Sequence, residues 1–124
     1  MKEKRKYRRY KVPAGRMFVF NHFSTRVGWI RDISREGVSF ECTQPTGAKV
    51  DPEIIDIFSY AYDRVFLPAI PCRKVFEVSS HDRIEEAKTK KTIVIGLHFE
   101  RLNDRQNKKI SDLIESYILP EEIS

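Results

Sequence analysis

Alternation of apolar and polar residues with a period of two is the feature of this sequence that most constrains its fold. It is clearest at residues 18–21, 38–42 and 93–99, and residues 26–33 and 69–78 have the composition of further strands. Successive side chains of a strand point to opposite faces, so the pattern predicts half-buried strands, with Phe18 and Phe20 in the apolar phase of the first. Turn-forming segments at 21–24, 44–47 and 79–91 separate the strands. Spacers of this kind predict antiparallel connections, because parallel strands need a long crossover.

The segment 50–65 fits two patterns. Asp51 followed by Pro52 can open a helical turn, whereas the apolar residues from Ile54 to Tyr62 also suit an extended edge strand. We favour the strand, which brings the expected number of strands to six.

The C-terminal region has a different period. Asn103 followed by Gln106 forms the pattern of a capping box. Apolar residues then recur at helical spacing, at Ile110, Leu113, Ile114, Tyr117 and Ile118. An amphipathic helix over residues 104–119 is therefore expected, ending just before Pro120.

Short strands followed by one helix predict a mostly-β fold. Closing the sheet removes the exposed edges that short strands would otherwise present, so we expect a small antiparallel six-stranded β-barrel with a C-terminal amphipathic α-helix. A chain of 124 residues has room for one such core.

The net charge of +5 is concentrated at the N-terminus. Residues 1–11 contain seven basic residues and one acidic residue, so the remainder of the chain is close to neutral. We expect residues 1–11 to form a basic arm and residues 12–124 to form a single barrel domain that includes the helix. An anion is the expected partner of the arm, although the run taken alone also suits a solvated tail.

The sequence D-I-S-R-E-G at residues 32–37 supplies complementary chemistry. Arginine side chains suit phosphate oxygens and the O6/N7 edge of guanine, while a carboxylate beside a hydroxyl suits the N1 and N2 donors of guanine. Asp32 and Ser34 can instead cap a β-turn through bonds to the backbone. Together with the arm, the turn predicts a site for a phosphorylated guanine nucleotide.

Two motifs in this order resemble those of the PilZ domains, bacterial receptors for the second messenger cyclic di-GMP. The first, R-x-x-x-R, runs from Arg5 to Arg9, and the second, D/N-x-S-x-x-G, runs from Asp32 to Gly37. The pattern continues in I-G-L-H-F at residues 95–99 and in the helix after it, so the resemblance covers nearly the whole chain.

The resemblance implies a cyclic di-GMP sensor or adaptor that changes conformation on binding and signals to a partner protein in motility, biofilm or secretion control. The ligand-binding residues it implies are Arg5, Arg8, Arg9, Asp32, Ser34 and Gly37. Arg5 and Arg9 would hold phosphates and the guanine edge, and Arg8 would either assist them or be surface charge only. Asp32 would accept from guanine N1 and N2, Ser34 would hold the base or a phosphate, and Gly37 is expected to supply a positive φ at the turn.

Enzyme and metal chemistry find no support in the sequence. It has no Gly-rich phosphate loop, no H-E-x-x-H and no G-x-S-x-G, so we expect no catalysis. Cys42 and Cys72 are expected to be reduced core thiols, without a metal or cofactor. No apolar run approaches the ~20 residues of a membrane span, which predicts a cytoplasmic protein.

Two alternatives from other classes stay open. One is a degenerate PilZ-like docking domain that binds a protein but no nucleotide, which the intact motifs disfavour. The other is a small barrel that binds nucleic acid, which would need exposed aromatic residues interleaved with bases. We expect most aromatic residues, including Trp29, in the core, and therefore disfavour nucleic acid as a partner.

Overall fold

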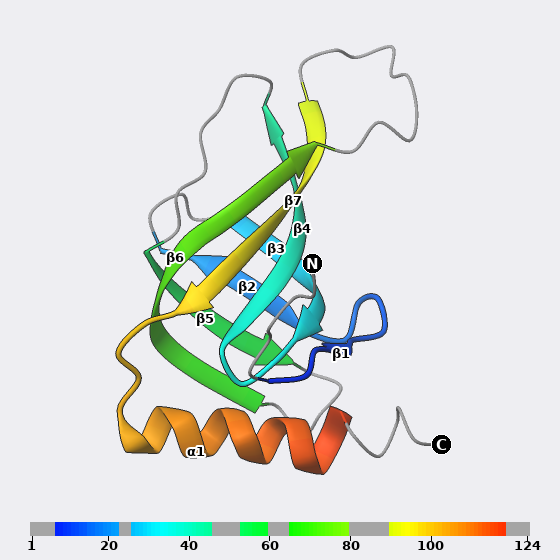
Figure 1. Cartoon of the computed structure of the whole chain (residues 1–124). Coiled ribbons are helices and arrows are strands. Elements are labelled where there is room, and N and C mark those ends of the chain that lie inside the picture. The colour runs from blue at the N-terminus through cyan, green and yellow to red at the C-terminus, as the bar shows by residue number, and fades with distance from the viewer. Residues whose placement is uncertain (1–6, 23–25, 46–52, 60–64, 80–89, 119–124) are drawn as a thin grey trace, which may run out of the picture.

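The computed structural model describes residues 7–22, 26–45, 53–59, 65–79 and 90–118. Within these ranges the chain forms seven strands followed by a helix (Figure 1). The strands are β1 (Tyr10–Lys11), β2 (Phe18–Asn21), β3 (Arg26–Ile33), β4 (Gly37–Pro45), β5 (Ile54–Ser59), β6 (Val65–Ser79) and β7 (Lys90–Phe99). The helix α1 (Asp104–Leu113) continues into a π-helical turn, Ile114–Ile118.

Six of the strands close into a barrel. The sheet runs in the order β1-β3-β2-β5-β6-β7-β4, and an additional pairing of β4 with β3 closes the six strands from β3 to β4. Every pairing is antiparallel, and β1 is an extra strand that pairs only with the end of β3. The prediction of a six-stranded antiparallel barrel with a C-terminal helix is confirmed, and closure leaves short strands such as β2 paired on both sides.

The barrel interior is filled mainly by branched aliphatic side chains. On β7, Ile93, Ile95, Leu97 and Phe99 are buried, as the alternation predicts. On β2 the predicted phase is wrong, because Val19 is fully buried and Phe18 and Phe20 lie on the outer face, partly exposed. Both faces of F-V-F are apolar, so the pattern alone cannot choose between them. The rings of Phe18 and Phe58 stack across β2 and β5 with their centroids 5.5 Å apart, which gives the outer face its own packing partner.

The ambiguous middle segment contains a strand, but not an edge strand. β5 pairs with β2 on one side and with β6 on the other. A bulge lies beside it, where Ala69 has a φ of 55° and its N–H donates to the Asp56 carboxylate at 2.8 Å. The parts of the expected segment at 50–52 and 60–64 lie outside the described residues. β4, β6 and β7 also extend into the turn-forming segments expected at their ends, because ladder pairing continues there.

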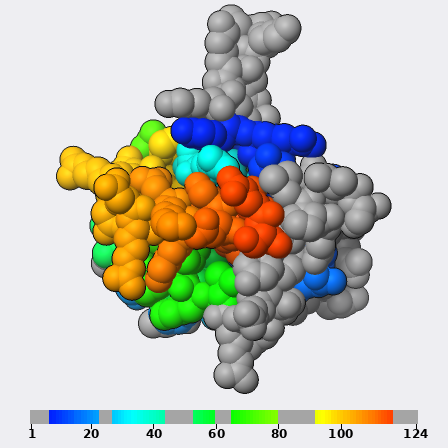
Figure 2. Space-filling view, turned by 90° about the horizontal axis from the view of Figure 1, so that it is seen from below, coloured from blue at the N-terminus to red at the C-terminus, as the bar shows by residue number. Residues whose placement is uncertain are grey.

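The helix closes one end of the barrel. Its capping box is present as predicted, since Gln106 N donates to Asn103 Oδ1 at 2.8 Å and Asn103 N donates to Gln106 Oε1 at 3.0 Å. Ile110, Leu113 and Ile114 are buried against the barrel. Figure 2 shows α1 lying across this end, with the N-terminal segment beside it. The α-helix changes to π-helix after Leu113, and residue 119 of the expected helix lies outside the described range.

Candidate functional site

An open cleft of about 260 Å³ lies where the β3–β4 turn meets β6 and β7. Its lining includes Arg9 from the arm and Asp32, Ser34 and Gly37 from the turn. Residues far apart in the sequence are therefore gathered at one place. The arrangement combines a cation, a carboxylate and a hydroxyl around a concave surface, and these groups can pair with an anion and with hydrogen-bond donors.

Ser34 organises the turn through its own backbone and side chain. Its N–H donates to Gly37 O at 2.9 Å, and its Oγ accepts from Glu36 N at 3.1 Å. The residue is only 3% exposed, although it contributes to the cleft lining. The turn-capping role is thus present in the structure. A hydroxyl has one donor and two acceptor positions, so this bond leaves capacity for a ligand.

Gly37 is required for a different reason from the one expected. The φ of Gly37 is not positive. Among the described glycines, only Gly15 has a positive φ. A Cβ at Gly37 would instead lie 2.3 Å from the carbonyl oxygen of Leu97 on β7. The turn sits directly on this strand, where Phe99 N also donates to Glu36 O at 2.9 Å. Gly37 therefore allows close backbone approach, and the positive-φ prediction is wrong.

Asp32 lies near the end of β3, opposite Lys11 on β1 and Ser39 on β4. It is partly exposed and lines the cleft. Within the described part of the chain, its carboxylate has no hydrogen-bond or ion-pair partner. A carboxylate without a protein partner at the edge of a cleft is available to accept hydrogen bonds from a ligand.

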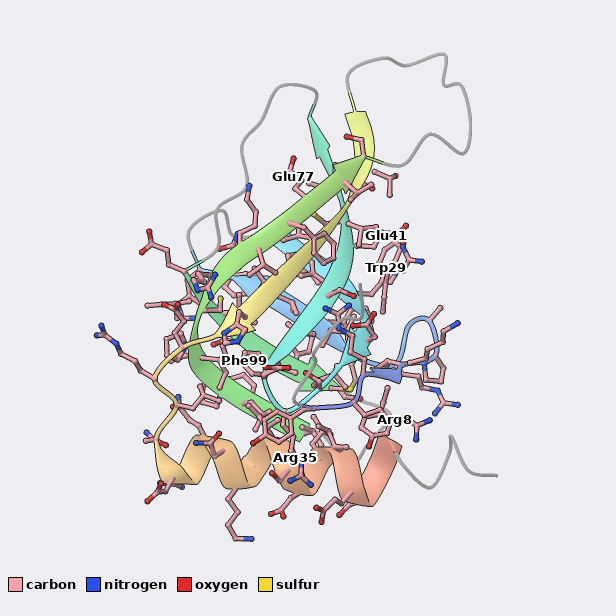
Figure 3. The ribbon with its side chains drawn as sticks, in the orientation of Figure 1. Arg8, Trp29, Arg35, Glu41, Glu77 and Phe99 are labelled. Carbon is pink, nitrogen blue, oxygen red and sulfur yellow. The ribbon has the colours of Figure 1, made fainter. Side chains whose placement is uncertain are left out.

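The three arginines of the arm are placed differently. Arg9 lines the cleft, whereas Arg8 does not and instead lies over the ring of Tyr10, 5.2 Å from its centroid. Figure 3 shows Arg8 beside β1. Arg5 lies outside the described residues. The structure thus brings together Arg9, Asp32, Ser34 and Gly37, and it holds Arg8 by a cation–π contact next to them.

The cleft lining also contains residues that were not predicted as site residues, among them Glu36, Val75, Phe76 and His98. The Phe76 ring covers Gly96, where a Cβ would come within 2.1 Å of a ring carbon. A lone glycine inside the alternating strand at 93–99 is the sequence signal that could have indicated this close approach. His98 and Glu36 both line the cleft. His98 Nδ1 lies 2.8 Å from Phe99 O, and His98 Nε2 lies 3.7 Å from a Glu36 carboxylate oxygen.

Trp29 corrects another expectation. It is 40% exposed on the outer face of the barrel, not in the core. Phe66 is 56% exposed on the same wall, in the row that runs through Phe58 and Phe18 to Trp29. Nucleic acid was disfavoured because the aromatic residues were expected in the core, and for this wall that expectation is wrong.

Both cysteines are buried and unpaired with each other. Burial, followed by the nearby Glu100 and Glu53 charges, raises the pKa of the Cys72 thiol to about 12. Over the described ranges, no cluster of three or more metal-ligating side chains is found. Nor does any helix within them have the length and apolarity to cross a membrane.

Comparison with known proteins gives a likeness in structure but not in sequence. No family model and no curated protein matches the chain. Among solved structures, the PilZ domain with c-di-GMP of YcgR from Escherichia coli matches with a TM-score of 0.70 and 14% identity, covering 97% of this chain and 95% of that one. The K. pneumonia MrkH–c-di-GMP complex matches with a TM-score of 0.69 and 13% identity. This match covers 98% of this chain, which spans about 55% of MrkH. The expected PilZ fold is therefore confirmed.

Proposed function

We propose that this chain, which has the fold of a PilZ domain, is a receptor for cyclic di-GMP that acts without catalysis. The observation that carries the proposal is the meeting of Arg9, Asp32 and Ser34 at one cleft. The two motifs that supply them are separated in the sequence, and the fold brings them together. The YcgR and MrkH structures that share the fold contain c-di-GMP, which supports the same ligand here.

Each side chain has a role that its geometry permits. The Arg9 guanidinium is exposed and would pair with a phosphate or with the O6/N7 edge of a guanine. The unpartnered carboxylate of Asp32 would accept from guanine N1 and N2. Ser34 would add a bond from a hydroxyl already oriented by the turn. Gly37 keeps the turn seated against β7 so that these groups stay in place.

The small size of the cleft favours a role for the basic arm in binding the ligand. Its volume of about 260 Å³ lies below the ~300–1,000 Å³ common for small-molecule pockets, so a cyclic dinucleotide would project beyond it. The arm adjoins the cleft at Arg9, and Arg5 and Arg8 would then cover the projecting part of the ligand. Ordering of the arm on the ligand would be the conformational change, and the altered surface would be read by a protein partner in motility, biofilm or secretion control.

Calorimetric titration tests this function. Cyclic di-GMP should bind wild-type protein in the micromolar range or tighter, GTP should not compete, and Arg9→Ala and Asp32→Asn should each weaken binding. Arg105→Ala, which removes the same charge from α1 away from the cleft lining, is the matched control. Absence of heat at high micromolar ligand, with the fold intact, would instead favour the docking-domain alternative. Binding of any single-stranded nucleic acid with steep salt dependence would favour the nucleic-acid alternative.

A further inference from the structure

A second cleft adjoins the candidate site on the outer wall of the barrel. Its volume is about 300 Å³, and Lys11, Trp29, Arg31 and Glu41 supply its charged and aromatic groups. Asp32 lines both clefts, so the two are neighbours that share one carboxylate. Figure 3 shows Trp29 and Glu41 next to each other on this wall, in agreement with their direct pairing across β3 and β4.

Trp29 forms the aromatic surface of this second cleft. Its side chain is 40% exposed, and Phe18 lies directly opposite it on β2. Phe18 in turn stacks on Phe58, so the outer face of β2 and β5 next to Trp29 also carries aromatic rings. A large ring that is exposed and lines a cleft is a suitable platform for a planar base.

The charges around Trp29 match a nucleotide. Lys11 is exposed, and the Arg31 side chain is 53% exposed. A distance of 3.8 Å separates Arg31 Nη1 from Glu41 Oε1. Exposed pairs of this kind contribute little, so the guanidinium can turn toward a ligand phosphate at small cost. Glu41 is a carboxylate of the second cleft, and a carboxylate accepts hydrogen bonds from the N–H edge of guanine.

We propose that this second cleft is a purine-nucleotide subsite in which a base stacks on Trp29 while Lys11 and Arg31 bind its phosphate. The proposal rests on the proposed function and extends it, because the subsite begins at Asp32, where the first cleft ends. Its occupant is a guanine nucleotide unit. That unit is either the second half of the molecule in the first cleft or part of a second molecule.

The chain contains a single tryptophan, so its fluorescence reports directly on this subsite. Cyclic di-GMP is titrated into the full chain by calorimetry and by tryptophan emission in parallel. Stacking of guanine on the indole should quench the emission with the same midpoint as the heat. Trp29→Ala should weaken binding by roughly 5- to 100-fold, whereas Trp29→Phe, which keeps a ring, should retain most of the affinity.

Val27→Ala is the matched control. Val27 is 51% exposed on the same outer face of β3, two residues from Trp29, but does not line the cleft. Its replacement should leave the affinity unchanged. A stoichiometry of one ligand per chain with quenching would assign the subsite to the second half of the same molecule. Two ligands per chain with quenching would assign it to a second molecule.

Two results would overturn the proposal, and they differ in what they leave standing. Normal heat of binding with unchanged emission, and with Trp29→Ala at wild-type affinity, would remove the subsite but leave the receptor function intact. Absence of both heat and quenching would remove the subsite and the receptor function together. Circular dichroism of each variant separates either result from a loss of fold.

Discussion

The turn and the arm, which form the two halves of the candidate site, are held in opposite ways. The turn at 32–37 is built into the barrel, with Ser34 buried and backbone bonds of 2.9 Å at Ser34 and Phe99. The arm is exposed at residues 7–9, and its strand β1 has only two residues paired with β3. The turn is therefore fixed by the barrel, whereas residues 7–9 of the arm are exposed to solvent. Under the proposed function, the turn would present a preorganised acceptor surface and the arm would supply charge that a ligand recruits.

Adding a Cβ to the turn at 32–37 should have the largest effect on stability and on nucleotide binding. Gly37→Ala directs a methyl group at the Leu97 carbonyl oxygen, and relaxation is limited because the nearest atoms are all backbone atoms of β7. We expect the free energy of unfolding to fall by about 1 to 3 kcal/mol and nucleotide binding to be lost. Chemical denaturation and calorimetry measure the two effects.

Gly15→Ala is the matched control for this substitution. Gly15 has a φ of +80°, but a Cβ at this position would meet no atom within 4 Å, so its replacement should cost about 1 kcal/mol of stability and leave affinity unchanged. Wild-type affinity in Gly37→Ala would show that the turn does not need its seat on β7.

Removing charge from the arm should weaken binding without changing stability. Because Arg9 is exposed and lines the cleft, Arg9→Ala should weaken cyclic di-GMP binding by roughly 10- to 100-fold, the worth of one charge-assisted bond. Arg8→Ala should have a smaller effect, because Arg8 lies on Tyr10 and outside the cleft lining. Calorimetry measures both. Equal losses in the two variants would mean that the arm acts only as a diffuse positive charge.

Ser34 tests whether the turn is held independently of ligand. In Ser34→Ala the Glu36 N–H loses its acceptor, so the free energy of unfolding should fall by about 1 to 3 kcal/mol even without nucleotide. Ser111→Ala on α1, at a partly buried position, should change the free energy of unfolding by less than about 0.5 kcal/mol. An unchanged midpoint in urea for Ser34→Ala would mean that the capping bond does not stabilise the turn.

The smallest effect is expected when the pH is raised, through the buried thiol of Cys72 in the barrel. Since the pKa of Cys72 is raised to about 12 in the folded protein, its thiol should resist alkylation at pH 8 and react on unfolding. The unfolded thiol loses its proton near pH 9, whereas the folded one keeps it to about pH 12, so stability should decline as pH rises between these values. Urea denaturation at pH 8 and pH 10, with Cys72→Ala as control, measures it. Rapid alkylation of folded protein would show that the barrel opens locally.

Much of the fold followed from local patterns. The phases of β4 and β7, the capping box at Asn103 and the bounds of β3 were predicted, because each depends on neighbouring residues along the chain. The predicted phase of β2 was wrong, and the reason is also physical. Its aliphatic and aromatic residues suit both faces, and the tertiary structure buries Val19 while Phe18 stacks on Phe58 of β5 outside.

The candidate site divides along the same line. The residue types of Arg9, Asp32 and Ser34 and their chemistry were determined by the sequence alone, since donors, acceptors and charges belong to side chains. Their convergence at one cleft, the need for Gly37 beside Leu97, and the exposure of Trp29 were decided only by the tertiary structure. These features arise from contacts between strands distant in sequence, and barrel closure determines which of those strands become neighbours.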